Sequence, residues 1–113
     1  MTEELWKDIA GYEGLYQVST LGRVRSLDVM KEQGRYGKRY EIFHKGRILK
    51  PWRGSGDYLA VTLYKDGISE FGYIHRLVAV AFLENPKGYK LVSFRDKNKF
   101  NTKLENLRWG RKD

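Results

Sequence analysis

The chain has 113 residues, 41% hydrophobic and 32% charged, and this composition predicts a single globular domain rather than a disordered segment. It contains no cysteine, which excludes a disulfide framework and a zinc site built on thiolates. The formal net charge is +8, and residues 30–56 and 88–113 carry the excess, whereas residues 1–29 and 57–87 are weakly acidic. Basic blocks of this kind attract phosphate, so nucleic acid is the expected partner, and a strongly solvated surface is the alternative explanation.

Membrane insertion and secretion are not expected. No apolar run approaches the roughly 18 residues that a transmembrane helix requires. The N-terminal residues Met1-Thr2-Glu3-Glu4 are acidic, whereas a secretory signal begins with basic and then apolar residues. We therefore expect a cytoplasmic protein without a membrane partner.

Strand patterns dominate the first two thirds of the chain. Residues 16–19 and 23–27 alternate between apolar and polar, which predicts a hairpin with Gly22 near its turn. Residues 30–40 contain two glycines, four basic side chains and few apolar ones, which predicts a mobile loop. A glycine-rich loop is also expected at 52–57. Further strands are predicted at 42–43, 47–49, 58–64 and 71–74, with turns at Lys45-Gly46 and Lys65-Asp66-Gly67.

The hydrophobic period changes after residue 74. Residues 75–82 place Leu77, Val78, Ala81 and Phe82 on one face at helical spacing, and Asn85-Pro86 should stop this helix. A strand at 89–92, a polar loop at 95–103 and a last short strand at 106–109 follow. Together, these elements predict an α+β fold with a mostly antiparallel sheet and one short central helix.

Two sets of residues at fixed offsets resemble the HNH homing endonucleases of phages. The first set resembles the short module that precedes their nuclease domains: Trp6-Lys7-Asp8-Ile9, Gly11-Tyr12-Glu13-Gly14, Tyr16, Val18-Ser19 and Gly22-Arg23-Val24. The second resembles the HNH region itself: His75-Arg76-Leu77-Val78-Ala79, Asp96, Asn98-Lys99, Asn101, Leu104, Asn106-Leu107 and Trp109. The two sets cover nearly the whole chain. The resemblance implies an N-terminal module (1–29), a basic β region (30–70) and a ββα-metal region (71–113) within one domain, with double-stranded DNA as partner in a bacterial host cell.

The chain departs from this family where the chemistry takes place. In the family pattern, the first strand of the motif ends with an acidic or amide residue and then the histidine that activates water. Ser93 and Phe94 stand in these places, and a phenyl ring neither accepts a proton nor binds a hard cation. Only four residues follow Trp109, so the helix with a further metal ligand is expected to be missing and the motif truncated. Asn106 matches the asparagine that shapes the loop.

The remaining candidates for chemistry are weaker. His75 opens the predicted helix, and we expect it to tie that helix to the ββ loop, although it is the fallback base if the chain cleaves DNA. His44 lies in a basic turn and is expected to be a surface residue. Asp96, Asn98 and Asn101 have alternating spacing, but Asx residues in loops usually bond their own backbone. We therefore predict no catalytic residue, no metal site and no cofactor.

Basic side chains form the predicted DNA-binding surface. Lys45 and Arg47 would share one face of an extended strand, which suits a β-ribbon lying along a groove. The loop at 95–103 is the one that faces the cut phosphate in an active relative. The predicted DNA-binding residues are Lys45, Arg47, Lys50, Arg53, Arg95, Lys97, Lys99, Lys103, Arg108 and Arg111.

These observations predict a catalytically inactive double-stranded DNA-binding protein that regulates or inhibits a DNA-acting machine, with a host or phage protein as a further partner. The first alternative is a nicking endonuclease dependent on magnesium or manganese, with His75 or His44 as its base. The second is a protein-binding inhibitor module that uses the former active-site face, and an exposed Phe94 would favour it.

Overall fold

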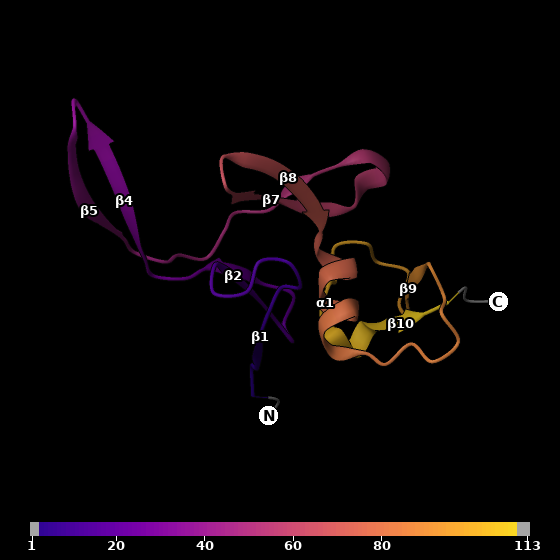
Figure 1. Cartoon of the computed structure of the whole chain (residues 1–113). Coiled ribbons are helices and arrows are strands. Elements are labelled where there is room, and N and C mark those ends of the chain that lie inside the picture. Colours follow the sequence, from indigo (N-terminus) through magenta and orange to yellow (C-terminus); the bar gives the residue numbers. More distant parts are fainter. Residues whose placement is uncertain (1–2, 111–113) are drawn as a thin grey trace.

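The computed structural model describes residues 3–110, in which small antiparallel sheets surround a single α-helix, α1 (Ile74–Phe82). Figure 1 shows α1 between the N-terminal strands and the C-terminal pair of strands. The described strands form two three-stranded and two two-stranded sheets, and every pairing is antiparallel. The expectation of a mostly antiparallel fold with one short helix is confirmed. No helix within residues 3–110 is long and apolar enough to cross a membrane.

The N-terminal sheet has the order β1 (Trp6–Asp8), β2 (Tyr16–Ser19), β3 (Val24–Ser26). The hairpin between β2 and β3 was predicted, and it forms because Val18 and Val24 face each other and are both buried. The added strand β1 was not expected, since its three residues show no alternation long enough to recognise.

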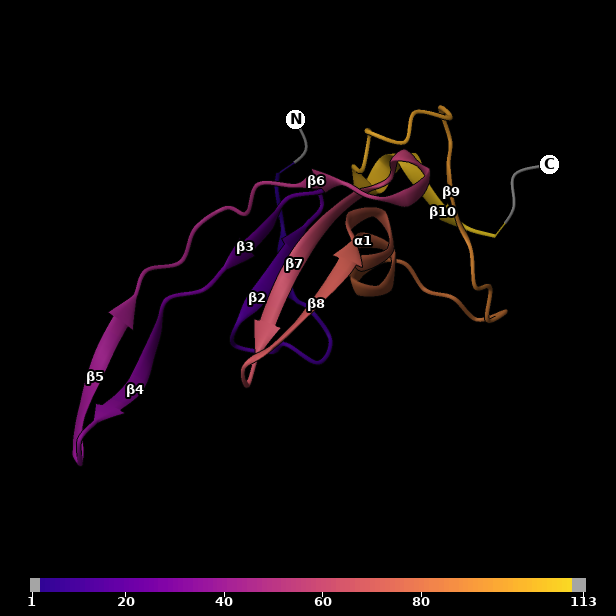
Figure 2. The ribbon, with the colours of Figure 1, turned by 90° about the horizontal axis from the view of Figure 1, so that it is seen from above.

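The segment predicted as a mobile loop at 30–40 is instead a hairpin, so that prediction was wrong. Strands β4 (Val29–Arg35) and β5 (Lys38–His44) pair over their whole length. Tyr36 and Gly37 both have positive φ angles, 55° and 78°, as a two-residue hairpin turn requires. Composition suggested a loop because this ribbon buries little apolar surface and is held by its backbone ladder. The hairpin projects from the body (Figures 1 and 2), and the molecule is 60 Å long.

The segment that follows the hairpin is extended, but it is not the predicted strand at 47–49. Only an isolated bridge joins Ile48 to Arg25, so the strand and the turn at Lys45-Gly46 were both wrong. The backbone instead runs beside β3, where the Ser26 N–H donates to the Arg47 carbonyl and the Leu49 N–H donates to the Val24 carbonyl. These bonds use the edge of β3 without forming a continuous ladder.

The third sheet has the order β6 (Trp52–Arg53), β7 (Leu59–Lys65), β8 (Ile68–Tyr73). The strand at β7 and its turn at Asp66-Gly67 were predicted, and β8 begins three residues earlier than expected. The predicted loop at 52–57 contains the short strand β6 and a 3₁₀ turn at Ser55–Asp57. This turn leads the chain back to β7 beside the C-terminal loop.

The core lies where α1 meets three sheets. Ile74, Val78 and Ala79 are the buried residues of the helix, and Leu77, Ala81 and Phe82 of the predicted face pack against the core while partly exposed. The helix ends at Phe82, before Asn85-Pro86, as expected. The other apolar members of the core come from every sheet except the projecting hairpin: Ile9, Tyr16, Val18, Val24, Val61, Leu63, Phe94 and Leu107.

The C-terminal pair consists of β9 (Val92–Phe94) and β10 (Leu107–Trp109), with Phe94 opposite Leu107. The first strand was predicted at 89–92 and lies later in the chain. The reason is local, because the Asn85 side chain accepts from the Tyr89 N–H at 2.9 Å and donates to the Tyr89 carbonyl at 2.7 Å. Tyr89 therefore has no free backbone groups for a ladder.

Candidate nucleic-acid interface

The loop between β9 and β10 is held by hydrogen bonds between its own polar residues. Asn106 is 6% exposed, and its Oδ1 accepts from the Asp96 N–H at 3.0 Å. Its Nδ2 donates to Asp96 Oδ1 at 2.9 Å and to the Asn101 carbonyl at 2.8 Å. The Arg95 N–H completes the frame by donating to the Asn106 carbonyl at 2.7 Å. The buried Asn106 side chain thus holds the exposed loop through hydrogen bonds to Asp96 and to the Asn101 backbone.

The Asp96 carboxylate is the second centre of this network. Its Oδ1 accepts from the Asn98 N–H at 2.8 Å, and its Oδ2 accepts from Asn101 Nδ2 at 2.9 Å. These donors, Asn101 first and the Asn98 backbone next, lower the pKa of the Asp96 carboxyl. The carboxylate is therefore ionised at neutral pH, and both of its oxygens accept hydrogen bonds from residues of the loop. Within residues 3–110, no group of three His, Asp or Glu side chains is arranged to hold a metal ion.

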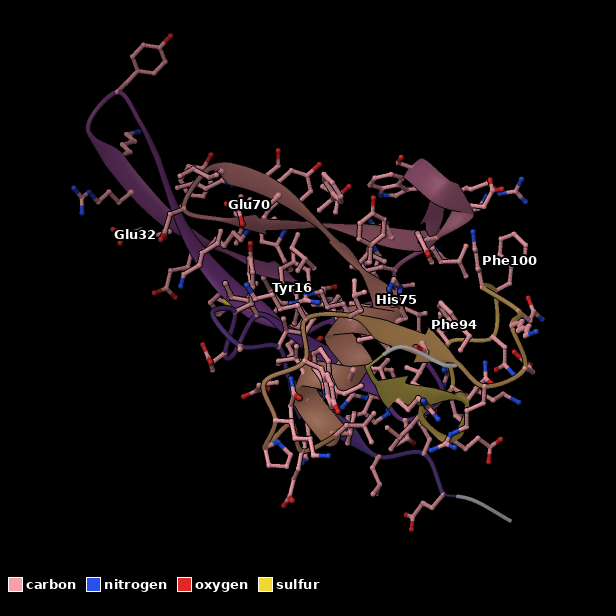
Figure 3. The ribbon with its side chains drawn as sticks, turned by 90° about the vertical axis from the view of Figure 1, so that its right-hand side faces the viewer. Tyr16, Glu32, Glu70, His75, Phe94 and Phe100 are labelled. Atoms are coloured by element: carbon pink, nitrogen blue, oxygen red, sulfur yellow. The ribbon has the colours of Figure 1, made fainter. Side chains whose placement is uncertain are left out.

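Ser93 and Phe94 occupy the end of β9, where the family pattern expects a ligand and a base. Ser93 lies opposite Arg108, and its hydroxyl donates to the Gly110 carbonyl. Phe94 is 8% exposed and packs against His75 and Tyr58, with ring centroids at 5.0 Å and 6.1 Å. Figure 3 shows Phe94 beside His75. A phenyl ring and a hydroxyl directed at a carbonyl do not fit a divalent cation.

His75 belongs to an aromatic cluster rather than to the polar loop. Its ring lies 4.9 Å from that of Tyr58 and 5.9 Å from that of Tyr73. Burial, with the neighbouring charge of Arg76, lowers the pKa of His75 to about 4. Its buried Nδ1 has no hydrogen-bond partner within the described residues. The packing of His75 on Phe94 joins α1 to the end of β9 rather than to the ββ loop itself.

The basic residues of the C-terminal loop face outward. Arg95, Lys97, Lys99 and Lys103 are all exposed. Lys97 follows a turn and has a φ of 63°, which directs the chain sharply at this point. Lys99 Nζ donates to the Gly56 carbonyl at 2.9 Å and lies 4.8 Å from the Tyr58 ring centroid. On β10, Arg108 is half-buried, and the predicted Arg111 lies outside the described residues.

The basic residues of the middle segment divide into two groups. Arg53 lies over the Phe100 ring at 5.0 Å, so the structure brings it to the C-terminal loop together with Lys99. Lys45 and Arg47 lie elsewhere, lining a groove of about 480 Å³. They do not share a strand, so the sequence argument for a common strand face was wrong. Lys50, which is exposed, lies between the two groups along the chain.

Sequence reasoning missed three features of the basic surface. The aromatic partners Tyr58 and Phe100 lie far in sequence from the cations they meet, and no local pattern marks them. Arg25 lies over the Trp6 ring at 4.0 Å, and Arg23 pairs with Glu4, so both arginines of the N-terminal hairpin have partners within the chain. The basic side chains of the β4–β5 hairpin were hidden because the segment was interpreted as a loop.

Comparisons with known proteins find a family model for the N-terminal half of the chain and relatives among HNH endonucleases for nearly all of it. The model of the family described as the NUMOD4 motif matches residues 4–64. The DNA endonuclease I-HmuI of Bacillus phage SP01 is 36% identical over 104 residues, which cover 92% of this chain and 51% of that protein. An uncharacterized HNH endonuclease of Acanthamoeba polyphaga mimivirus is 38% identical over 70 residues, 60% of this chain and 21% of that protein.

A solved structure, described as DNA binding and cleavage by the HNH homing endonuclease I-HmuI, matches the fold with a TM-score of 0.70 at 36% identity. The match covers 94% of this chain and 52% of that one. The chain thus spans about half the length of I-HmuI and about a fifth of the mimivirus relative.

Proposed function

The chain belongs to the NUMOD4 family and is a homologue of the phage HNH homing endonuclease I-HmuI, and on this basis we propose that it binds double-stranded DNA without cleaving it. Occupied DNA is closed to other proteins, so the chain would regulate or inhibit a DNA-acting machine. The compartment that follows from this role is the cytoplasm of a bacterial host, and a host or phage protein acting at the same DNA would be its competitor or partner.

The environment of Phe94 is the observation that carries the proposal. Hydrolysis of a phosphodiester needs a group that accepts a proton within hydrogen-bond reach of the attacking water. At this place the chain has a ring that is 8% exposed and stacked in a core cluster. In the adjoining loop, the Asp96 carboxylate already accepts three hydrogen bonds from its neighbours. The loop is thus preserved in shape while its side chains are used for structure.

The cations around this loop support DNA as the ligand. Lys97, Lys99 and Arg95 surround the rigid Asp96–Asn106 frame, and Arg53 joins them from β6. Contacts between such side chains and phosphates position a protein on the duplex, and they do not depend on base sequence. We therefore propose that this group binds the phosphate backbone, and that Lys45, Arg47, Lys50, Lys103, Arg108 and Arg111 extend the contact.

The nicking alternative is supported by the homologue, which is an endonuclease, but it requires a base other than the residue at position 94. His75 is poorly suited, because a base with a pKa of about 4 has little affinity for the proton of water. His44 lies on the projecting hairpin, on β5. An exposed Phe94 would have favoured the protein-binding alternative, and the burial of that side chain removes this support.

Gel shift and plasmid nicking in parallel test the proposal, each with and without magnesium or manganese. The unaltered chain should shift duplex DNA and leave supercoiled plasmid intact under both conditions. Replacing Lys97 and Lys99 by glutamine should weaken binding roughly thirtyfold at 0.15 M salt, if each lysine contacts one phosphate. Metal-dependent nicking by the unaltered chain would overturn the non-catalytic part of the proposal. A chain that fails to shift DNA at low salt would overturn all of it.

A Ser93→Asp, Phe94→His variant separates loss of chemistry from loss of binding. It restores the two residue types of the family pattern on β9 and leaves the basic loop unchanged. We expect DNA affinity to fall by roughly fivefold at most, because the new carboxylate lies opposite Arg108, one of the proposed contacts, and the cations of the loop are unchanged. Because histidine replaces a buried ring, circular dichroism and an unfolding curve must accompany the comparison.

A further inference from the structure

The β4–β5 hairpin has two chemically different faces. Residues directly opposite each other in an antiparallel pair share a face, and successive pairs alternate between faces. The pairs Lys31–Ile42 and Gln33–Tyr40 therefore lie on one face, and Lys38 belongs to the same face at the outer end. The pairs Met30–Phe43 and Glu32–Glu41 lie on the other.

Charge separates between these two faces. Both acidic residues of the segment 29–44 lie on the second face, where Arg39 pairs with Glu32 at 3.2 Å. Lys31 and Lys38 lie on the first face with no acidic residue of the hairpin beside them. Both lysines are exposed. A single ribbon thus has one basic face and one face whose cation is neutralised within the hairpin.

The hairpin is also placed to reach a ligand beyond the body of the protein. It projects as a two-stranded ribbon away from α1 and the other sheets (Figure 1). Tyr36 at its tip is 98% exposed, and Tyr40 on the basic face is 51% exposed. At its base, Lys31 and His44 line the same groove as Lys45 and Arg47, so the basic face continues into the proposed DNA-binding surface.

The spacing along the basic face suits a DNA groove. Lys38 lies opposite residue 35, four residues along the strand from Lys31, so the two positions are about 14 Å apart. The major groove of B-DNA is about 12 Å wide and admits a two-stranded ribbon. Gln33 and Tyr40 lie between the lysines, and their amide and hydroxyl groups are able to hydrogen-bond base edges.

We propose that the β4–β5 hairpin is a DNA-binding arm whose basic face spans the major groove, with Lys31 and Lys38 on phosphates of opposite strands. The proposal rests on the proposed function, since it adds a second contact to DNA already held by the β9–β10 loop. The arm lengthens the site in the direction of the hairpin and brings Gln33 and Tyr40 over the bases. Its opposite face, with Glu32 and Glu41, faces solvent.

Two neighbouring residues provide a matched test. Lys38→Gln and Arg39→Gln each remove one exposed positive charge from adjacent positions of β5, but from opposite faces. In gel shifts with the full chain, Lys38→Gln should weaken binding roughly fivefold at 0.15 M salt and lower the slope of log K against log salt by about 0.9. Arg39→Gln should change affinity by less than about twofold. Equal effects of the two variants, or no effect of either, would overturn the arm.

Footprinting distinguishes failure of the arm from failure of the proposed function. Lys31→Gln with Lys38→Gln should remove hydroxyl-radical protection at one end of the footprint and leave the rest. Loss of binding in the Lys97, Lys99 variant with an unchanged footprint in the Lys31, Lys38 variant would reject the arm alone. Absence of any shift by the unaltered chain would reject both. Circular dichroism should show every variant folded, since the substituted side chains are exposed.

Discussion

His75 makes the stability of this protein sensitive to acid. Its ring is packed among Tyr58, Tyr73 and Phe94, and burial favours the neutral form. The folded-state pKa is about 4, below the ordinary value of 6.5 that the unfolded chain retains. Between these values the unfolded state binds a proton that the folded state does not, so stability falls as pH falls from 6.5 to about 4.

We expect this effect to cost on the order of 1–2 kcal/mol by pH 4, allowing for solvent screening of a partly exposed ring. Urea unfolding curves between pH 4 and pH 8 measure it. A His75→Phe variant keeps the aromatic packing and removes the titrating group, so its profile should be flatter over this window. A variant profile as steep as that of the unaltered chain would assign the acid sensitivity to other groups.

Gly22 is the second residue on which the fold depends. Its φ is +79°, and a Cβ atom there would lie 2.2 Å from Thr102 Oγ1 and 2.7 Å from the Thr102 carbonyl oxygen. This approach joins the turn of the N-terminal hairpin to the C-terminal loop. Gly22→Ala therefore adds both backbone strain and a steric overlap with backbone, and we expect a loss of about 3 kcal/mol or more in the free energy of unfolding.

Gly37→Ala is the matched control for this experiment. Gly37 has nearly the same φ, +78°, but nothing lies within 4 Å of the added Cβ position. The control therefore measures backbone strain alone, about 1–2 kcal/mol at most. If denaturation gave equal losses for the two variants, the close approach of Gly22 to Thr102 would contribute nothing.

At the scale of elements, the hydroxyl of the buried Tyr16 joins the N-terminal sheet to β7. The Tyr16 hydroxyl accepts from the Tyr64 N–H at 3.0 Å, and Tyr16 is 9% exposed. Tyr16→Phe leaves that N–H without its acceptor, and we expect a loss of about 1–2 kcal/mol in the free energy of unfolding. Tyr12→Phe removes a 3.3 Å bond from the connection between β1 and β2 to Glu70 of β8, and this bond is exposed to water. A loss from Tyr12→Phe as large as that from Tyr16→Phe would contradict the role assigned to burial.

Which elements were predictable depended on where their stabilising contacts lie. The β7–β8 hairpin was predicted because alternation and the Asp66-Gly67 turn are both local signals. The β4–β5 hairpin was missed because its glycines and charges are typical of loops, and its stability lies in a backbone ladder that composition does not record. The strand at 89–92 was misplaced because the Asn85 side chain bonds the backbone of Tyr89.

The candidate site likewise has residues that local sequence patterns identify and contacts that only the folded structure reveals. Asn106 and Phe94 were recognised from their places in a family pattern, because the offsets along the chain are fixed. The contacts of Arg53 with Phe100 and of Lys99 with Gly56 join segments more than forty residues apart, and they depend on how β6 packs beside the C-terminal loop. The basic residues could be named from the sequence, but which of them lie together in space could not be predicted.

At the scale of the whole molecule, the basic residues divide into separate regions. Figure 2 shows that the connection between β5 and β6 begins at the base of the projecting hairpin, on the other side of the body from the loop between β9 and β10, and runs from there to β6. Lys45 and Arg47 line the groove at the base of the arm, whereas Lys99 lies against the turn at Gly56. Two groups on different parts of the surface should act independently on binding.

This separation leads to a test of additivity. We expect Lys45→Gln with Arg47→Gln, and Lys97→Gln with Lys99→Gln, each to lower the salt slope of DNA binding by about 1.8, since each pair removes two phosphate contacts. The variant with all four substitutions should then lose the product of the two fold-changes in Kd, because the pairs contact different phosphates of one duplex. Gel shifts over a range of salt concentrations measure both quantities. If the fourfold variant bound as well as the Lys97, Lys99 variant, DNA would be held by the C-terminal loop alone and the basic block before β6 would serve only solvation.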